Sequence, residues 1–158
     1  MTGRHPHRLA YLRLCAIIAP GLTMAWNDSD RPLKLRPHHI CCLPFLTLDG
    51  DNLDRSFFDT LISVQEALKS ELGLYIETVE GPDYVCQACP SCIRGRCESP
   101  PIQEEKVRKL DRFLLRDLGM AYGQILTVEE WQSVISRKWP YRLCRICRWR
   151  HHCGAAPA

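Results

Sequence analysis

Residues 86–97 read CQACPSCIRGRC, a run in which cysteine recurs with the spacing C-x2-C-x2-C-x4-C. A C-x2-C pair turns the backbone so that two thiolates face one centre, and such pairs are the usual mark of zinc or iron–sulfur ligation. Proline and glycine within and around this run favour an irregular loop, from which thiolates can converge. We therefore expect a metal or cluster site formed by Cys86, Cys89, Cys92 and Cys97.

Most of the remaining cysteines, of ten in the chain, lie in two other places. Cys144, Cys147 and Cys153 form a second loop with the spacing C-x2-C-x5-C. Cys41 and Cys42 follow directly after two histidines. A disulfide framework is an alternative for a secreted chain, but metal binding is the commoner use of C-x2-C inside cells.

The composition is that of an ordinary globular protein. The chain has 158 residues, of which 46% are apolar and 25% charged, which predicts one domain with a real core. The net charge of +3 is too small to imply nucleic-acid binding by itself. No segment is long enough to cross a membrane, so we expect a soluble cytoplasmic protein without a membrane partner.

The first residues differ from the rest of the chain. Three arginines precede a short apolar run that Pro20 and Gly21 interrupt, and Met24 follows. We interpret residues 1–23, which include Cys15, as a non-native or disordered extension and Met24 as the true start. Residues 24–158 are then a single cysteine-rich, cluster-binding domain.

Alternation and helical periodicity predict the main elements. Strands are expected at Leu33–Arg36 and Leu74–Val79, and a helix begins near His38. A second helix runs from a Ser56 cap to Leu72, before Gly73. The expected class is α+β, mostly α: a small single domain of three to four helices, a short strand pair and two cysteine loops.

Two further helices have clearer end signals. Residues 103–118 carry an apolar stripe and stop at Gly119. Thr127 and Glu130 have the spacing of a capping box that opens another helix, which Pro140 closes.

The chain after Trp131 has no acidic residue but many basic ones. A solvated tail, compensation for an anionic thiolate–metal site, and contact with nucleic acid or another anionic partner would each account for this. The basic side chains nearest the second cysteine loop are Arg142, Arg145, Arg148, Arg150, His151 and His152.

Three separated motifs together resemble an uncharacterised prokaryotic family, domain of unknown function 1284. Residues 36–42 read RPHHICC, residues 83–90 read DYVCQACP and residues 144–149 read CRICRW; Cys97, Asp111 and Leu118-Gly119 also match. The resemblance extends from Leu33 to Cys153 and implies an iron–sulfur cluster, for which we expect the 4Fe–4S type. Zinc is the alternative, because it would take the same four sulfurs in a tetrahedron.

The resemblance also implies a set of ligands: Cys42, Cys86, Cys89, Cys97, Cys144, Cys147 and Cys153. Cys41 stands where the family has an aliphatic residue, and Cys92 is an extra thiol. Whether Cys92 or Cys97 completes the first loop is open. Cys42 is the first candidate to complete the second loop. Either all seven of these cysteines share two sites, or some hold one cluster and the rest are structural; we expect at least one four-cysteine cluster that joins both loops.

His38 and His39 lie close to Cys42 in the sequence, and two roles are open for them. They pack and hydrogen-bond within the body, or one of them binds the metal or donates to a cluster sulfur. We include both histidines among the candidate metal-site residues.

The sequence contains no Gly-rich phosphate loop, no G-x-S-x-G and no H-E-x-x-H, so a non-enzymatic role is favoured over an enzyme with an open iron. The first hypothesis is an iron–sulfur protein that carries electrons to a redox partner protein or senses redox state. The alternative is a zinc-stabilised binding module whose basic tail contacts nucleic acid or an acidic partner protein.

Overall fold

The computed structural model describes residues 31–100, 103–139 and 141–154. The predictions for residues 1–23, Met24 and Pro140 therefore fall outside the described residues. Within the described ranges the chain is a small α+β structure that is mostly helical, as predicted. None of the helices in these ranges is long and apolar enough to cross a membrane.

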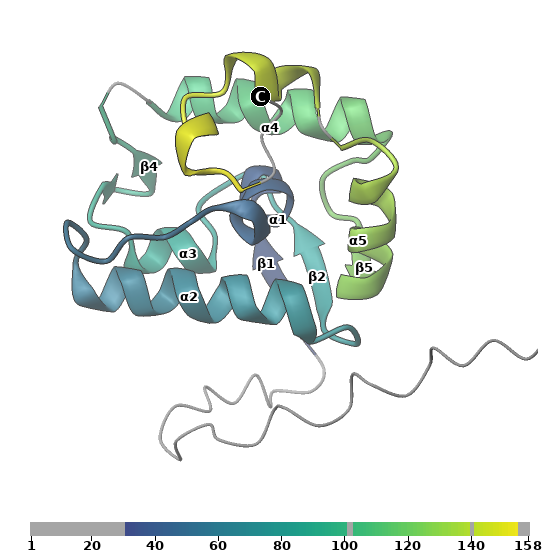
Figure 1. Cartoon of the computed structure of the whole chain (residues 1–158), viewed down its shortest axis with the longest axis horizontal. Coiled ribbons are helices and arrows are strands. Elements are labelled where there is room, and N and C mark those ends of the chain that lie inside the picture. Colours follow the sequence, from purple (N-terminus) through teal and green to yellow (C-terminus); the bar gives the residue numbers. More distant parts are fainter. Residues whose placement is uncertain (1–30, 101–102, 140, 155–158) are drawn as a thin grey trace, which may run out of the picture.

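A three-stranded sheet lies among the helices, in the order β1-β2-β5 (Figure 1). It consists of β1 (Leu33–Leu35), β2 (Tyr75–Thr78) and β5 (Ile125–Thr127). β1 pairs parallel to β2, and β5 pairs antiparallel to it. The two predicted strands are confirmed. The third was missed, because three residues that lead directly into a helix cap are too few to show alternation.

Two short helices follow β1 directly. α1 (Pro37–Cys42) begins with proline at its first position, and the 3₁₀ turn η1 (Leu43–Phe45) continues it. α1 contacts α4 (Glu104–Leu118), and η1 contacts α2 (Arg55–Ser70). In Figure 1, α1 accordingly lies between the two long helices.

The start of α2 differs from the prediction. Asp54 is the cap, since its carboxylate accepts from the Phe57 N–H at 3.1 Å, and the helix already includes Ser56. Asp and Ser are about equally good caps, so sequence preference could not choose between them. The helix ends at Ser70, two residues before the predicted Leu72.

The predicted stop of one later helix and the predicted start of the next are confirmed. α4 ends at Gly119, which has a left-handed φ of 69°. Thr127 and Glu130 form the expected capping box at the start of α5 (Val128–Ser136), whose inner face buries Val128, Trp131 and Ile135.

The first cysteine region is more regular than predicted. Asp83 caps the short helix α3 (Tyr84–Ala88), and a hairpin follows, formed by β3 (Cys92–Ile93) and β4 (Arg96–Cys97). Arg94 and Gly95 connect the two strands with φ of 51° and 72°. A two-residue hairpin turn needs these positive φ values, which is why glycine is suited to it.

The C-terminal segment returns to the beginning of the described chain. It contains the 3₁₀ turns η2 (Arg142–Ile146) and η3 (Arg150–His152). The Thr47 N–H donates to the His152 carbonyl at 2.6 Å, and the Gly154 N–H donates to the Phe45 carbonyl at 2.9 Å. Between these bonds, Leu46 forms an isolated bridge with Cys153.

Candidate metal centre

A fully buried arginine connects β1 and α1 to α4. The Arg36 side chain donates from Nε to Asp111 at 2.9 Å and from Nη1 to Glu104 at 3.1 Å. Burial by itself would lower the pKa of Arg36, but the hydrogen bonds and charges of Glu104 and Asp111 raise it above its usual value. Arg36 therefore stays charged inside the protein and fixes both carboxylates.

Each of the two adjacent histidines has its own carboxylate partner. His38 Nδ1 lies 2.7 Å from Asp111 Oδ1, and His39 Nδ1 lies 2.6 Å from Asp83 Oδ2. Burial, followed by the neighbouring His39, lowers the pKa of His38, which is therefore neutral at pH 7. The side chains of Arg36, His38 and His39 thus each bind a carboxylate from another part of the chain.

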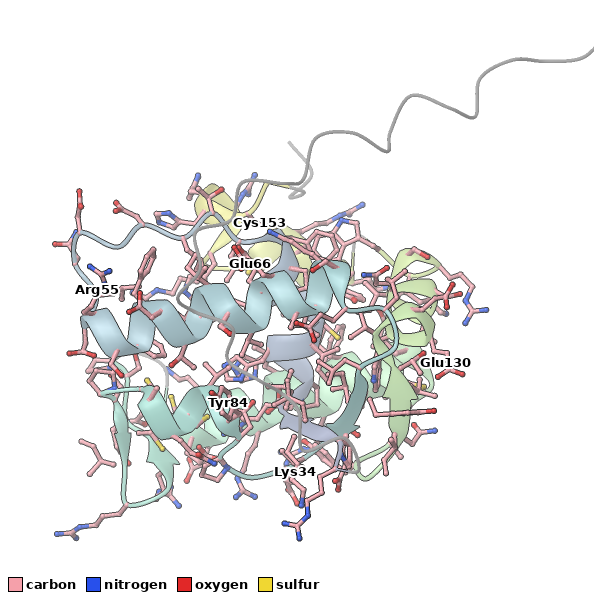
Figure 2. The ribbon with its side chains drawn as sticks, turned by 90° about the horizontal axis from the view of Figure 1, so that it is seen from below. Lys34, Arg55, Glu66, Tyr84, Glu130 and Cys153 are labelled. Atoms are coloured by element: carbon pink, nitrogen blue, oxygen red, sulfur yellow. The ribbon has the colours of Figure 1, made fainter. Side chains whose placement is uncertain are left out.

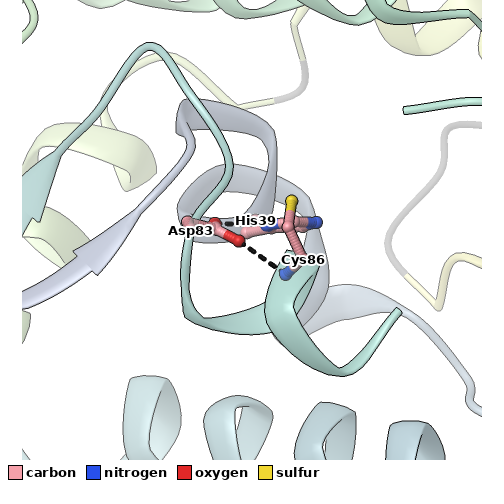
Figure 3. A group of neighbouring side chains, drawn as sticks. All are labelled: His39, Asp83 and Cys86. Carbon is pink, nitrogen blue, oxygen red and sulfur yellow. Dashed lines mark hydrogen bonds and ion pairs between the residues drawn. The ribbon is translucent and has the colours of Figure 1, made fainter. Parts of the chain in front are cut away.

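Asp83 uses both carboxylate oxygens. Oδ2 accepts from the Arg36 backbone N–H at 2.6 Å as well as from His39, and Oδ1 accepts from the Cys86 N–H at 2.9 Å. Figure 3 shows the carboxylate bonded to both the His39 ring and the start of α3. Burial would raise the pKa of Asp83, but His39 and the two backbone donors hold it far below its usual range.

The cysteines of the first loop surround a small cavity of about 70 Å³. Cys86 lies on α3, and its N–H is fixed by Asp83. Cys92 and Cys97 face each other across the hairpin. The Cys97 N–H donates to Glu104 at 2.9 Å, which ties this hairpin to the buried carboxylates. The cavity is lined by all four of these cysteines and also by His38 and His39.

The first group of thiols suits a cation. Burial, and next the charge of Asp83, raises the pKa of Cys86 well above its usual value. Burial also raises the pKa of Cys89 and of Cys92. Thiols in such surroundings stay protonated unless a positive charge replaces the protons, and soft thiolates select zinc, copper(I) or iron–sulfur clusters. The donor set therefore fits a metal.

The second group combines Cys42 of α1 with the C-terminal loop. Burial raises the pKa of Cys42 well above its usual range, and the neighbouring thiols of Cys41, Cys147, Cys144 and Cys153 raise it further. The bridge between Leu46 and Cys153 holds the two segments together. Four thiols from distant parts of the sequence thus lie close enough to affect one another: Cys42, Cys144, Cys147 and Cys153.

Cys41 occupies a different environment from its neighbour Cys42. It is 1% exposed and belongs to the hydrophobic core. Burial raises its pKa to about 12. Its side chain thus packs as a small apolar group.

Among the described residues, the cysteines of the two loops lie in two groups. Besides the adjacent Cys41, the thiols that raise the pKa of Cys42 belong to the second loop, whereas those that raise the pKa of Cys89 are Cys97 and Cys92 of the first. Figure 2 shows Cys153 and Tyr84, the first residue of α3, on opposite sides of α2. Cys42, the first candidate from the sequence to complete the second loop, lies with that loop, and the expected cluster joining both loops stays a prediction.

Sequence analysis gave no role to three buried acids: Asp83, Glu104 and Asp111. A signal for two of them was present. Glu104 and Asp111 fall on the apolar stripe of α4, in helical register with Val107 and Leu114. An acid at such a position is buried and needs a cationic or N–H partner.

These features define a small α+β protein with two cysteine-rich groups and a candidate metal site. The chain belongs to the family described as protein of unknown function (DUF1284), whose model matches residues 53–153. The match includes both cysteine loops and leaves out residues 36–42. No curated protein and no solved structure matches the chain.

Proposed function

We propose that this protein holds metal at two thiolate centres, that these are iron–sulfur clusters, and that it carries electrons or senses redox state. Cys86, Cys89, Cys92 and Cys97 would hold the first cluster, and Cys42, Cys144, Cys147 and Cys153 the second. Such a cluster supplies reversible electron uptake.

The observation that carries this proposal is the position of Cys42. It lies more than a hundred residues before Cys144 in the sequence, yet both cysteines pack against the same core and the Leu46–Cys153 bridge brings their segments together. Four half-buried thiols that converge from distant segments, with no disulfide among the described cysteines, are explained by a shared metal. Packing alone would be served better by apolar side chains.

The charge around the second group supports a protein partner. Arg142, Arg145, Arg148 and Arg150 are all exposed. A cluster held by four thiolates is anionic, so these arginines compensate its charge and also attract an acidic surface. We infer that the redox partner presents acidic residues to this side.

A zinc-stabilised binding module is the second candidate. It is favoured by the compact first group, in which Cys92 and Cys97 pair across a tight hairpin beside a cavity of about 70 Å³. One tetrahedral ion needs little space. In this alternative the exposed arginines contact nucleic acid or an acidic protein.

Anaerobic purification of the full chain separates the two candidates. We expect brown protein with broad visible absorption and with iron and acid-labile sulfide bound in stoichiometric amounts. Colourless protein that contains stoichiometric zinc and no iron would overturn the iron–sulfur proposal and support the zinc module.

A further inference from the structure

The cavity of the first cysteine group has more donors than a four-ligand site requires, because two histidines line it beside the four cysteines. His39 lines the same cavity as Cys86, Cys89, Cys92 and Cys97. One donor atom each of His39, Asp83 and Cys86 lies within 4.8 Å of the others. Among the described residues, these three side chains form the group of histidine, carboxylate and thiol ligand atoms that lie within this distance of one another.

Asp83 already accepts three hydrogen bonds, and we assign it an orienting role rather than that of a ligand. Its Oδ2 accepts from Arg36 and His39, and its Oδ1 accepts from the Cys86 N–H. An ionised carboxylate only accepts hydrogen bonds, so His39 must donate from Nδ1. The nitrogen of His39 that is left for another partner is Nε2.

A carboxylate that orients a histidine through one nitrogen commonly accompanies metal binding through the other. Here the carboxylate also fixes the backbone of Cys86, so one residue positions two donors. His38 is bonded in a similar way to Asp111, but it does not take part in the close group with Cys86.

We propose that His39 binds the metal of the first cysteine group directly through Nε2, and that Asp83 is its positioning residue. This inference rests on the proposed metal binding at that group. It replaces one thiolate by a neutral imidazole and leaves one of the loop cysteines without a direct bond to the metal. A site with one thiolate fewer carries less negative charge, which raises the reduction potential of a cluster.

The test uses the full chain, grown with ¹⁵N-labelled histidine and purified anaerobically. If metal analysis finds iron, pulsed electron paramagnetic resonance spectra are recorded on the reduced protein. If it finds zinc, the zinc is replaced by cobalt(II) and the spectra are recorded on the substituted protein. Metal analysis thus decides the proposed function, whereas the nitrogen signal decides the role of His39.

We expect a strong histidine ¹⁵N coupling in the wild type, which is lost in His39→Gln and retained in the matched control His38→Gln. A wild type without strong coupling, or a coupling that survives in His39→Gln, would overturn the proposal.

A second variant covers the case in which His39→Gln does not fold. The chain has six histidines, so replacing the other five by glutamine leaves His39 alone. The coupling should persist in that variant with unchanged strength. Its disappearance would assign the nitrogen to another histidine and contradict the proposal.

Discussion

Glu104 and Glu105 are adjacent in the sequence, but their surroundings differ completely. Glu104 is 1% exposed and accepts hydrogen bonds from Arg36, from the Cys97 N–H and from Arg108. Glu105 is exposed, and its contact with Arg96 is 4.0 Å long. Only the first of these two carboxylates ties α4 to the buried arginine and to the first cysteine group.

We predict that Glu104→Gln lowers the free energy of unfolding by about 3 kcal/mol, because it leaves a buried arginine with one partner fewer. The matched control Glu105→Gln should change it by less than about 0.5 kcal/mol. Urea denaturation near neutral pH measures both values. Equal losses in the two variants would show that the buried network does not stabilise the fold.

The difference in free energy of unfolding between wild type and Glu104→Gln should depend on pH with a definite sign. Burial would raise the pKa of Glu104, but Arg36 and the Cys97 N–H lower it below the value of an unfolded chain, about 4.3. The stabilisation is therefore complete above that value and is lost as pH falls toward the lower, folded-state pKa. The gap between wild type and Glu104→Gln should shrink below about pH 4; a gap that widens in acid contradicts this assignment.

At the scale of elements, the glycines that follow the two long helices differ in backbone conformation. Gly119 closes α4 with a φ of 69°, and its N–H donates to the Arg116 carbonyl at 3.2 Å. Gly73, which follows α2, does not have a positive φ, and a Cβ there would meet no atom within 4 Å. Gly119 thus directly follows its helix in the left-handed conformation, whereas Gly73 lies beyond the Glu71 cap of α2 and does not need that conformation.

We expect Gly119→Ala to lower the free energy of unfolding by about 1 kcal/mol, since an L side chain is strained in the left-handed region. Gly73→Ala should cause no loss, because it introduces neither this strain nor a clash. Thermal or urea denaturation of both variants provides the comparison. A larger loss for Gly73→Ala than for Gly119→Ala would contradict the assigned conformations.

For the whole molecule, the sequence predicted what depends on neighbouring residues. The stripe of α4, its stop at Gly119 and the capping box at Thr127 are local signals, and all three are confirmed. The pairing of Arg36 with Glu104 and Asp111 joins residues 68 and 75 positions apart. No periodicity encodes such a contact, so the buried network could not be predicted, although two misplaced acids on an apolar stripe indicated it.

The cysteine groups show the same difference between local signals, which the sequence contains, and tertiary contacts, which it does not. The first loop was recognised because its spacing is local. The separation of the two groups depends on how the C-terminal segment returns to residues 45–47, which is a tertiary feature. The sequence alone therefore left open how the cysteines divide between sites, and the expected cluster joining both loops stays a prediction.

The central claim is that metal is held at two separate thiolate groups, and metal content per chain tests it most directly. Wild type, Cys42→Ser, Cys86→Ser and the adjacent control Cys41→Ser are purified anaerobically, and bound metal is counted. Because each group holds its own centre, Cys42→Ser and Cys86→Ser should each lose about half of the metal, whereas Cys41→Ser should keep all of it. Complete loss in either of the first two variants, or equal loss in Cys41→Ser and Cys42→Ser, would contradict the account.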